Sequence, residues 1–117
     1  ALATDIGGGP YLSMLDVLTS FVRQNQAAGM TSATFSRGLY RSTQAGADVL
    51  DLGGRKGSFT PGKDLDFISV KASSKQLNAS SADAVLAAVL LPLESDREAY
   101  ESLILKTVVE GGTVFQC

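Results

Sequence analysis

Apolar residues recur every three or four positions in the first half of the chain. The first such series lies within residues 11–28 and consists of Tyr11, Met14, Leu15, Leu18, Phe21 and Val22. This spacing places the apolar side chains on one face of an α-helix. Ser13 or Pro10 can mark the start of this helix, and Gly29 suits the position just after its end. The pattern therefore predicts an amphipathic helix that stops before Gly29.

The same spacing continues in a second series, formed by Phe35, Leu39, Tyr40, Thr43, Ala47 and Leu50. It predicts a second helix, with Thr31 or Ser32 as the N-cap. This helix should stop near Asp51, because the Gly53-Gly54 pair that follows disfavours a helical backbone.

Turn and strand patterns follow the predicted helices. Pro61 and Gly62 predict a turn, since proline suits its second position and glycine accepts the positive φ of its third. Residues 66–70 contain a β-prone run and predict a strand.

A polar, serine-rich stretch covers residues 71–81 and predicts a loop. Its last residues, Ser80 and Ser81, are both suitable N-caps. The apolar residues that come next predict a short buried helix over residues 82–91, which Pro92 ends.

Two β-prone runs within residues 104–116 are separated by Gly111 and Gly112. A pair of glycines at the centre predicts a hairpin with a two-residue turn, in which both central residues have positive φ. Together with the strand at 66–70, the hairpin makes a small sheet. The pattern as a whole therefore predicts an α+β fold.

Composition and charge limit the classes of protein. The 117 residues suffice for about one domain, and 44% of them are apolar, so a hydrophobic core is expected. The net charge is −2 and the 10 Lys and Arg residues are scattered, which argues against a nucleic-acid partner. The longest apolar run, residues 84–91, is too short to span a membrane, and no targeting pattern is visible. No membrane partner and a cytoplasmic location are therefore expected.

The chain contains one cysteine, Cys117, and no histidine. A single cysteine excludes an internal disulfide and a cysteine-rich zinc site, and it leaves the role of Cys117 open. Without histidine, this chain alone can form neither a Ser-His or Cys-His nucleophile pair nor an ordinary histidine-based zinc site.

Asp5 is the first candidate for chemistry, in the segment TDIGGGPYLSML (residues 4–15). Glycines before a helix can form an anion-binding nest, but the segment lacks the Lys and Ser/Thr of a P-loop and does not match G-x-G-x-x-G. Composition alone favours a turn residue, since Asp commonly accepts hydrogen bonds in turns. A catalytic carboxylate is the remaining interpretation.

Lys63, Asp64 and Asp66 form a second candidate, a charged cluster beside the predicted turn and strand. Charges in such positions are usually solvated, and we favour that interpretation over a catalytic one. The aromatic residues at helical spacing are likewise expected in the core rather than on a ligand-stacking surface; they are Tyr11, Phe21, Phe35 and Tyr40.

Four segments, in this order, resemble the C-terminal part of the amidohydrolase superfamily, and within it guanine deaminases most closely. They read TDIGGGPYLSML, GLYRSTQAGADVLDL, GRKGSFTPGKDLDFISV and LKTVVEGGTVF. The resemblance implies one unit over residues 1–117. Residues 1–53 would be helices from the end of a (β/α)8 barrel, and residues 54–117 a small antiparallel sheet from the accompanying β-sandwich, with an inserted helix. The full barrel is not expected in this chain.

The resemblance also implies a role for Asp5. In the family, the matching aspartate ends the eighth barrel strand, is a ligand of the catalytic zinc, and accepts the proton of the attacking water. The reaction implied is guanine plus water to xanthine plus ammonia, a step of purine catabolism. Four residues would shape the loop around this carboxylate: Thr4, Gly7, Gly8 and Gly9.

The absence of histidine sets this chain apart from the family, which completes its zinc site with histidines that precede the Thr-Asp pair. We therefore expect the isolated chain to be inactive and to hold no zinc through Asp5 alone. Its expected partner is the missing barrel segment or a second copy of the chain, with guanine as the parent substrate. Two alternatives stay open: a self-standing binding or oligomerisation module without catalysis, or a catalytic half whose histidines come from a separate chain.

Overall fold

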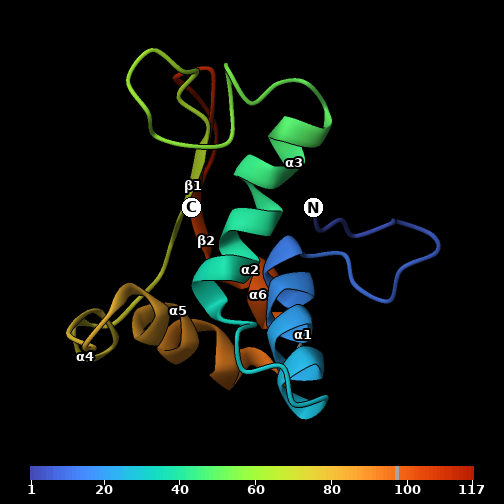
Figure 1. Ribbon diagram of the computed structural model, residues 1–117. Coiled ribbons are helices and arrows are strands. Elements are labelled where there is room, and N and C mark those ends of the chain that lie inside the picture. Colours follow the sequence, from blue (N-terminus) through green and yellow to red (C-terminus); the bar gives the residue numbers. More distant parts are fainter. Residues whose placement is uncertain (97) are drawn as a thin grey trace.

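The computed structural model describes residues 1–96 and 98–117, which form helices and one small antiparallel sheet (Figure 1). The helices are α1 (Met14–Ala27), α2 (Phe35–Ser42), α3 (Gln44–Val49), α4 (Ser74–Leu77), α5 (Ala82–Leu90) and α6 (Ala99–Ser102), with a 3-10 turn at Leu91–Leu93. The strands are β1 (Phe67–Val70), β2 (Ile104–Val109) and β3 (Gly112–Gln116), in the order β1-β2-β3. The predicted α+β class is confirmed, and no barrel is present among the described residues.

Helix α1 begins and ends where local sequence signals place it. The Ser13 side chain accepts a hydrogen bond from the Leu15 N–H at 3.2 Å, which caps the first turn. Gly29 follows the helix with a φ of 84°, a left-handed conformation that glycine adopts without steric cost. The prediction of this helix is confirmed.

The second predicted helix is instead two helices, and its predicted cap is wrong. Thr34, rather than Thr31 or Ser32, caps α2 by accepting from the Arg37 N–H at 3.2 Å. The backbone then leaves the helical region at Thr43, between α2 and α3. The hydroxyls of the last two residues before α3 donate to carbonyls four positions earlier, from Ser42 to Gly38 and from Thr43 to Leu39. Such bonds offer the backbone an alternative to continued helix.

The predicted loop over residues 71–81 contains the short helix α4. Ser73 and Gln76 form a capping box around its first turn, in which each side chain bonds the other residue's backbone N–H. The sequence S-S-K-Q carries this signal. The helix after the loop starts as predicted, because Ser81 caps α5 by accepting from the Ala84 N–H.

The hairpin turn lies one residue earlier than predicted. Its central residues are Glu110 and Gly111, with φ values of 50° and 78°, and Gly112 already belongs to β3. Two central residues with positive φ are typical of a type I′ turn. Glu110 tolerates this conformation because its N–H donates to the Asp66 carboxylate at 2.7 Å, and the Gly111 N–H donates to the Leu65 carbonyl at 3.0 Å.

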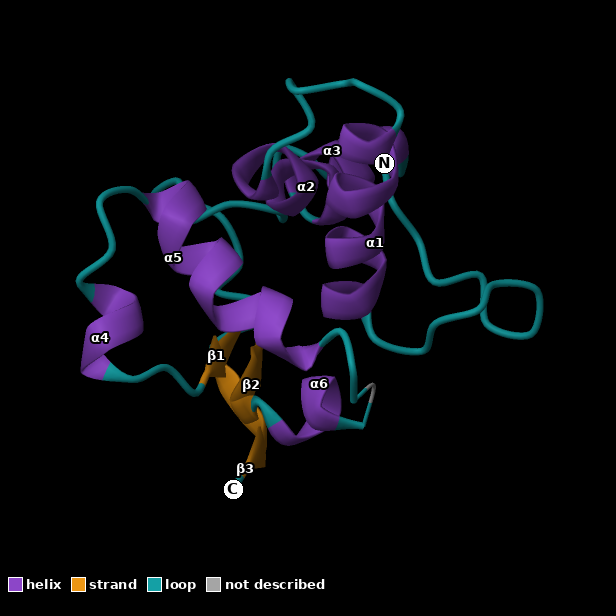
Figure 2. Cartoon of the chain, turned by 90° about the horizontal axis from the view of Figure 1, so that it is seen from below, coloured by secondary structure: helices purple, strands orange, loops and turns teal. Residues whose placement is uncertain are grey.

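The hydrophobic core lies among the helices. It consists of Leu18, Val22, Phe35, Val89, Leu90 and Tyr100. Of the four aromatic residues expected in the core, only Phe35 is buried, whereas Tyr40 is 54% exposed. Figure 2 shows α2 and α3 at one end of the molecule and the sheet at the other, with α5 between them. Among the described helices, none has both the length and the apolar character needed to cross a lipid bilayer.

Candidate functional site

The Asp5 loop, residues 3–9, connects the first residues of the chain to α1 and contains no helix or strand. Its start is tied to α2, because the Leu2 N–H donates to the Arg41 carbonyl at 2.9 Å. Asp5 adopts a left-handed backbone conformation with a φ of 50°, which Asp accepts more readily than most residues. The Asp5 carbonyl receives the N–H groups of Gly8 at 2.8 Å and Gly9 at 2.5 Å. Asp5 is thus a turn residue through its main chain.

The glycines leave room for the Asp5 side chain. A Cβ atom at Gly8 would come within 2.7 Å of the Asp5 carboxylate, and one at Gly9 would collide with the Thr4 carbonyl. The N–H groups of these two glycines bond to the Asp5 carbonyl and so are not directed at an anion. The loop geometry therefore supports a presented carboxylate better than a phosphate nest.

The Asp5 carboxylate is exposed, and within the described part of the chain it makes no hydrogen bond or ion pair. It borders a shallow depression between the loop and α1, whose lining includes Thr4, Tyr11 and Phe21. No group of three or more His, Cys, Asp or Glu side chains that could hold a metal occurs among residues 1–96 and 98–117. A zinc site needs about four ligands, so the donor set of this chain does not fit zinc by itself.

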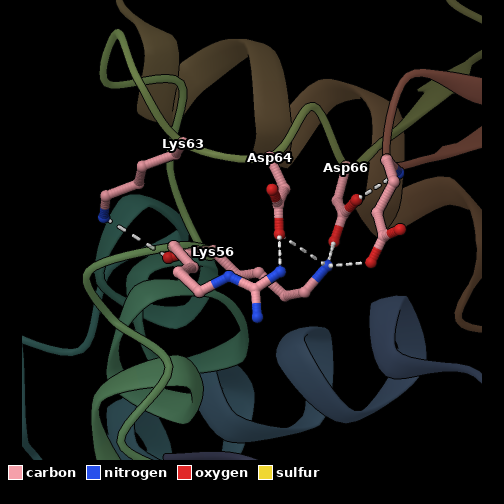
Figure 3. Close-up of polar contacts among 6 residues, drawn as sticks. Lys56, Lys63, Asp64 and Asp66 are labelled. Carbon is pink, nitrogen blue, oxygen red and sulfur yellow. Dashed lines mark hydrogen bonds and ion pairs between the residues drawn. The ribbon is translucent and has the colours of Figure 1, made fainter.

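A second polar site, the Lys56 cluster, consists of Lys56, Asp64, Asp66 and Glu110 (Figure 3). The Lys56 ammonium lies 2.7 Å from a carboxylate oxygen of Asp66, 3.3 Å from one of Asp64 and 3.6 Å from one of Glu110. Arg55 adds an ion pair with Asp64 at 3.0 Å. The cluster thereby ties the loop before β1 to the β2–β3 turn.

Lys63 points away from this cluster. Its ammonium donates to the Gln44 side chain at 2.9 Å and to the Lys56 carbonyl at 3.3 Å. The structure therefore brings Asp64 and Asp66 together, as predicted candidates, but separates Lys63 from them. Lys56 and Glu110 were missed. Glu110 lies 44 positions from Asp66, and no local pattern connects the two. Lys56 lies only ten positions from Asp66.

The ion pairs shift two ionisation equilibria. The pKa of Asp66 lies below its usual value of 3.8, chiefly because its carboxylate accepts the Glu110 N–H and also bonds Lys56. The pKa of Lys56 lies above its usual value of 10.5, chiefly because of the hydrogen bond to Asp66. Both shifts favour the charged forms, which is typical of a structural ion-pair network and supports the non-catalytic interpretation.

Replacing Lys56 by methionine is expected to lower the melting temperature by a few degrees at neutral pH. The effect should stay moderate because the ion pairs are partly exposed to water. The contribution of Asp66 to stability is present above pH 3.8 and is lost as the pH falls through its lower folded-state pKa. The difference in melting temperature between wild type and variant should therefore shrink in acid. Thermal unfolding followed by circular dichroism would measure this.

Lys75→Met is the matched control, because Lys75 is exposed and has no ion pair in the described residues. It should leave the melting temperature unchanged at every pH. An equal loss in both variants would show that the Lys56 cluster contributes nothing specific to stability.

Comparison with known proteins identifies the segment. No family model matches the chain. A protein of Deinococcus radiodurans described as "Probable guanine deaminase" is 34% identical over 125 residues, which cover 98% of this chain and 27% of that protein. The guanine deaminase of Escherichia coli is 28% identical over 120 residues, which cover 98% of this chain and 26% of that protein. This chain matches one segment of guanine deaminases.

Solved structures agree with this guanine deaminase match. The E. coli guanine deaminase structure superposes with a TM-score of 0.75 at 30% identity, covering 98% of this chain and 27% of that chain. The Bradyrhizobium japonicum guanine deaminase structure gives a TM-score of 0.70 at 21% identity and supports the fold alone. The chain thus spans 26–30% of the length of these guanine deaminases. The resemblance read from the sequence is confirmed at the level of a guanine-deaminase-like segment.

Proposed function

We propose that this chain is the C-terminal segment of a guanine-deaminase-like zinc aminohydrolase. The reaction of such an enzyme is guanine plus water to xanthine plus ammonia, in purine catabolism. The exposed Asp5 carboxylate, free of hydrogen bonds and ion pairs within the described residues, carries this proposal together with the match to guanine deaminases. A carboxylate without a partner among residues 1–96 and 98–117 is available to a site completed by residues from elsewhere.

Asp5 has the chemistry that hydrolytic deamination needs. The reaction moves a proton from the attacking water to the departing amino group, and a positioned carboxylate can accept that proton and return it. Asp5 would also be one ligand of the zinc ion, whose other ligands, histidines, lie outside this chain. In this proposal residues 1–53 hold the Asp5 loop at the barrel end, and residues 54–117 form the smaller sheet-containing part.

The proposal is tested on the native polypeptide that carries residues 1–117. We expect its mass to exceed the 12.2 kDa of this segment, its sequence to include histidine ligands, and its preparation to contain about one zinc per chain. Its conversion of guanine should be visible as a loss of guanine absorbance, whereas the isolated 117-residue chain should give none. A native mass of 12.2 kDa, or turnover by the isolated chain, would contradict the proposal.

A further inference from the structure

The three consecutive glycines of the Asp5 loop have different surroundings. Gly7 adopts a φ of 99°, and a Cβ added to it would meet no atom within 4 Å. A Cβ at Gly9 would collide with main-chain atoms of Thr4 and Asp5. The backbone conformation therefore favours glycine at position 7, and close main-chain packing favours it at position 9. Neither reason applies to Gly8.

The nearest neighbours of Gly8 all belong to the Asp5 side chain. The φ of Gly8 is not positive, so it lies outside the left-handed region that favours glycine. The three atoms closest to a Cβ added at Gly8 would be Oδ2, Cγ and Oδ1 of Asp5, at 2.7, 3.3 and 3.5 Å. The shortest of these distances is far inside van der Waals contact, which begins at about 3.5 Å between carbon atoms. A side chain at position 8 and the Asp5 carboxylate therefore compete for the same space.

We propose that Gly8 is a positioning residue, whose missing side chain keeps open the space that the Asp5 carboxylate occupies in this structure. Gly8 itself touches no reacting group and acts only through the orientation of that carboxylate. The steric step, in which position 8 decides how the Asp5 side chain is oriented, depends on the loop alone. The consequence for catalysis rests on the proposed function, in which this carboxylate accepts and returns a proton.

The carboxylate is the part of the loop that moves most easily when position 8 is enlarged. It makes no hydrogen bond or ion pair among residues 1–96 and 98–117, so rotation about the side-chain torsions of Asp5 breaks no contact there. The main chain is held by the bonds from the N–H groups of Gly8 and Gly9 to the Asp5 carbonyl. Figure 1 shows the loop projecting from the helices, with open space around it. Alanine at position 8 should therefore turn the carboxylate and leave the main-chain turn in place.

Kinetics of Gly8→Ala in the native polypeptide test the catalytic consequence. We expect kcat for guanine to fall at least about tenfold, because a displacement of about 1 Å in a reacting group can cost about a hundredfold in rate. The KM for guanine should change less than about twofold, since the carboxylate acts on the transferred proton. The melting temperature should be unchanged or slightly higher, because alanine lowers the conformational entropy of the unfolded chain. A glycine with a merely structural role would instead lower the melting temperature on replacement.

NMR spectroscopy of the 117-residue chain tests the steric step without any turnover. The three-bond couplings between the Hα and Hβ protons of Asp5 report the populations of its side-chain rotamers. We expect Gly8→Ala to change these couplings, while the amide shifts of α1 and α2 stay the same. Gly54→Ala is the matched control, because Gly54 is exposed, has no positive φ, and would place its Cβ more than 4 Å from any neighbour. It should change neither the Asp5 couplings nor kcat.

The two measurements separate this proposal from the proposed function. Altered Asp5 couplings together with a lower kcat in Gly8→Ala support the positioning role. Unchanged couplings, or a lower melting temperature in Gly8→Ala, overturn it. If Asp5→Asn abolishes turnover and Gly8→Ala retains it in full, the proposed function stands and the positioning role is wrong. If the native polypeptide does not convert guanine, the proposed function is wrong, and the couplings alone decide whether position 8 orients the carboxylate.

Discussion

Replacing Asp5 by asparagine in the native polypeptide is expected to lower guanine turnover by at least about a hundredfold, because the amide cannot accept the proton that the carboxylate accepts. Asparagine has nearly the same volume and tolerates the left-handed φ of 50° at this position. The loop should therefore keep its conformation, because the main-chain carbonyl of residue 5 still accepts the N–H groups of Gly8 and Gly9. Steady-state kinetics on guanine, with zinc content measured in parallel, would quantify the loss.

Asp51→Asn is the matched control for this experiment. Asp51 is also exposed and also adopts a positive φ, of 58°, but it lies after α3, outside the Asp5 loop. Its replacement should leave both turnover and zinc content unchanged. Retained activity in Asp5→Asn, or an equal loss in both variants, would remove Asp5 from the proposed chemistry.

Replacing Tyr100 by alanine is expected to have the largest effect on stability. Tyr100 is completely buried, lies in the core with Leu18 and Leu90, and donates its hydroxyl to the Leu90 carbonyl at 3.3 Å. Removing a buried aromatic side chain costs about 3–5 kcal/mol, a large part of the roughly 5–15 kcal/mol that stabilises a typical domain. Urea unfolding of the isolated chain, followed by circular dichroism, would measure the change in the free energy of unfolding.

Two further tyrosine variants separate the contribution of the hydroxyl from that of the ring, and the effect of burial from that of the side chain itself. Tyr100→Phe keeps the ring and loses only the hydroxyl, so it should cost about 0.5–1.5 kcal/mol. Tyr40→Ala removes the same side chain from a position that is 54% exposed and should cost far less than Tyr100→Ala. If Tyr40→Ala and Tyr100→Ala were equally destabilising, the helical core described for this chain would be wrong.

Features that depend on local signals could be predicted from the sequence. The caps at Ser13 and Ser81 and the glycine after α1 each depend on a few neighbouring residues. Each cap is one of the two candidates that the sequence offered, and the glycine lies where the pattern placed it. The capping box at Ser73 and Gln76 was equally local and was missed only because the serine-rich composition favoured a loop. Local hydrogen bonding thus determines much of where these helices begin.

Features that depend on distant residues could not be predicted in this way. The turn at Glu110 is shifted because a carboxylate 44 positions away binds its N–H, which no glycine pattern reveals. The same contact brings Glu110 to the Lys56 cluster, whereas Lys56 lies only ten positions from Asp66. The chemistry proposed for Asp5 came from resemblance to a family, since the residues around it equally suit an ordinary turn. Its main chain does form that turn, and its carboxylate is left exposed.

The pairing of β1 with β2 has a consequence for the order of folding. The strands are neighbours in the sheet, but residues 71–103, including α4, α5 and α6, separate them in the chain. Closing so long a loop costs conformational entropy before any strand contact forms, whereas the contacts within each helix are local. During synthesis β1 would emerge from the ribosome well before its partner. We therefore expect the sheet to form late, as one of the last steps of folding.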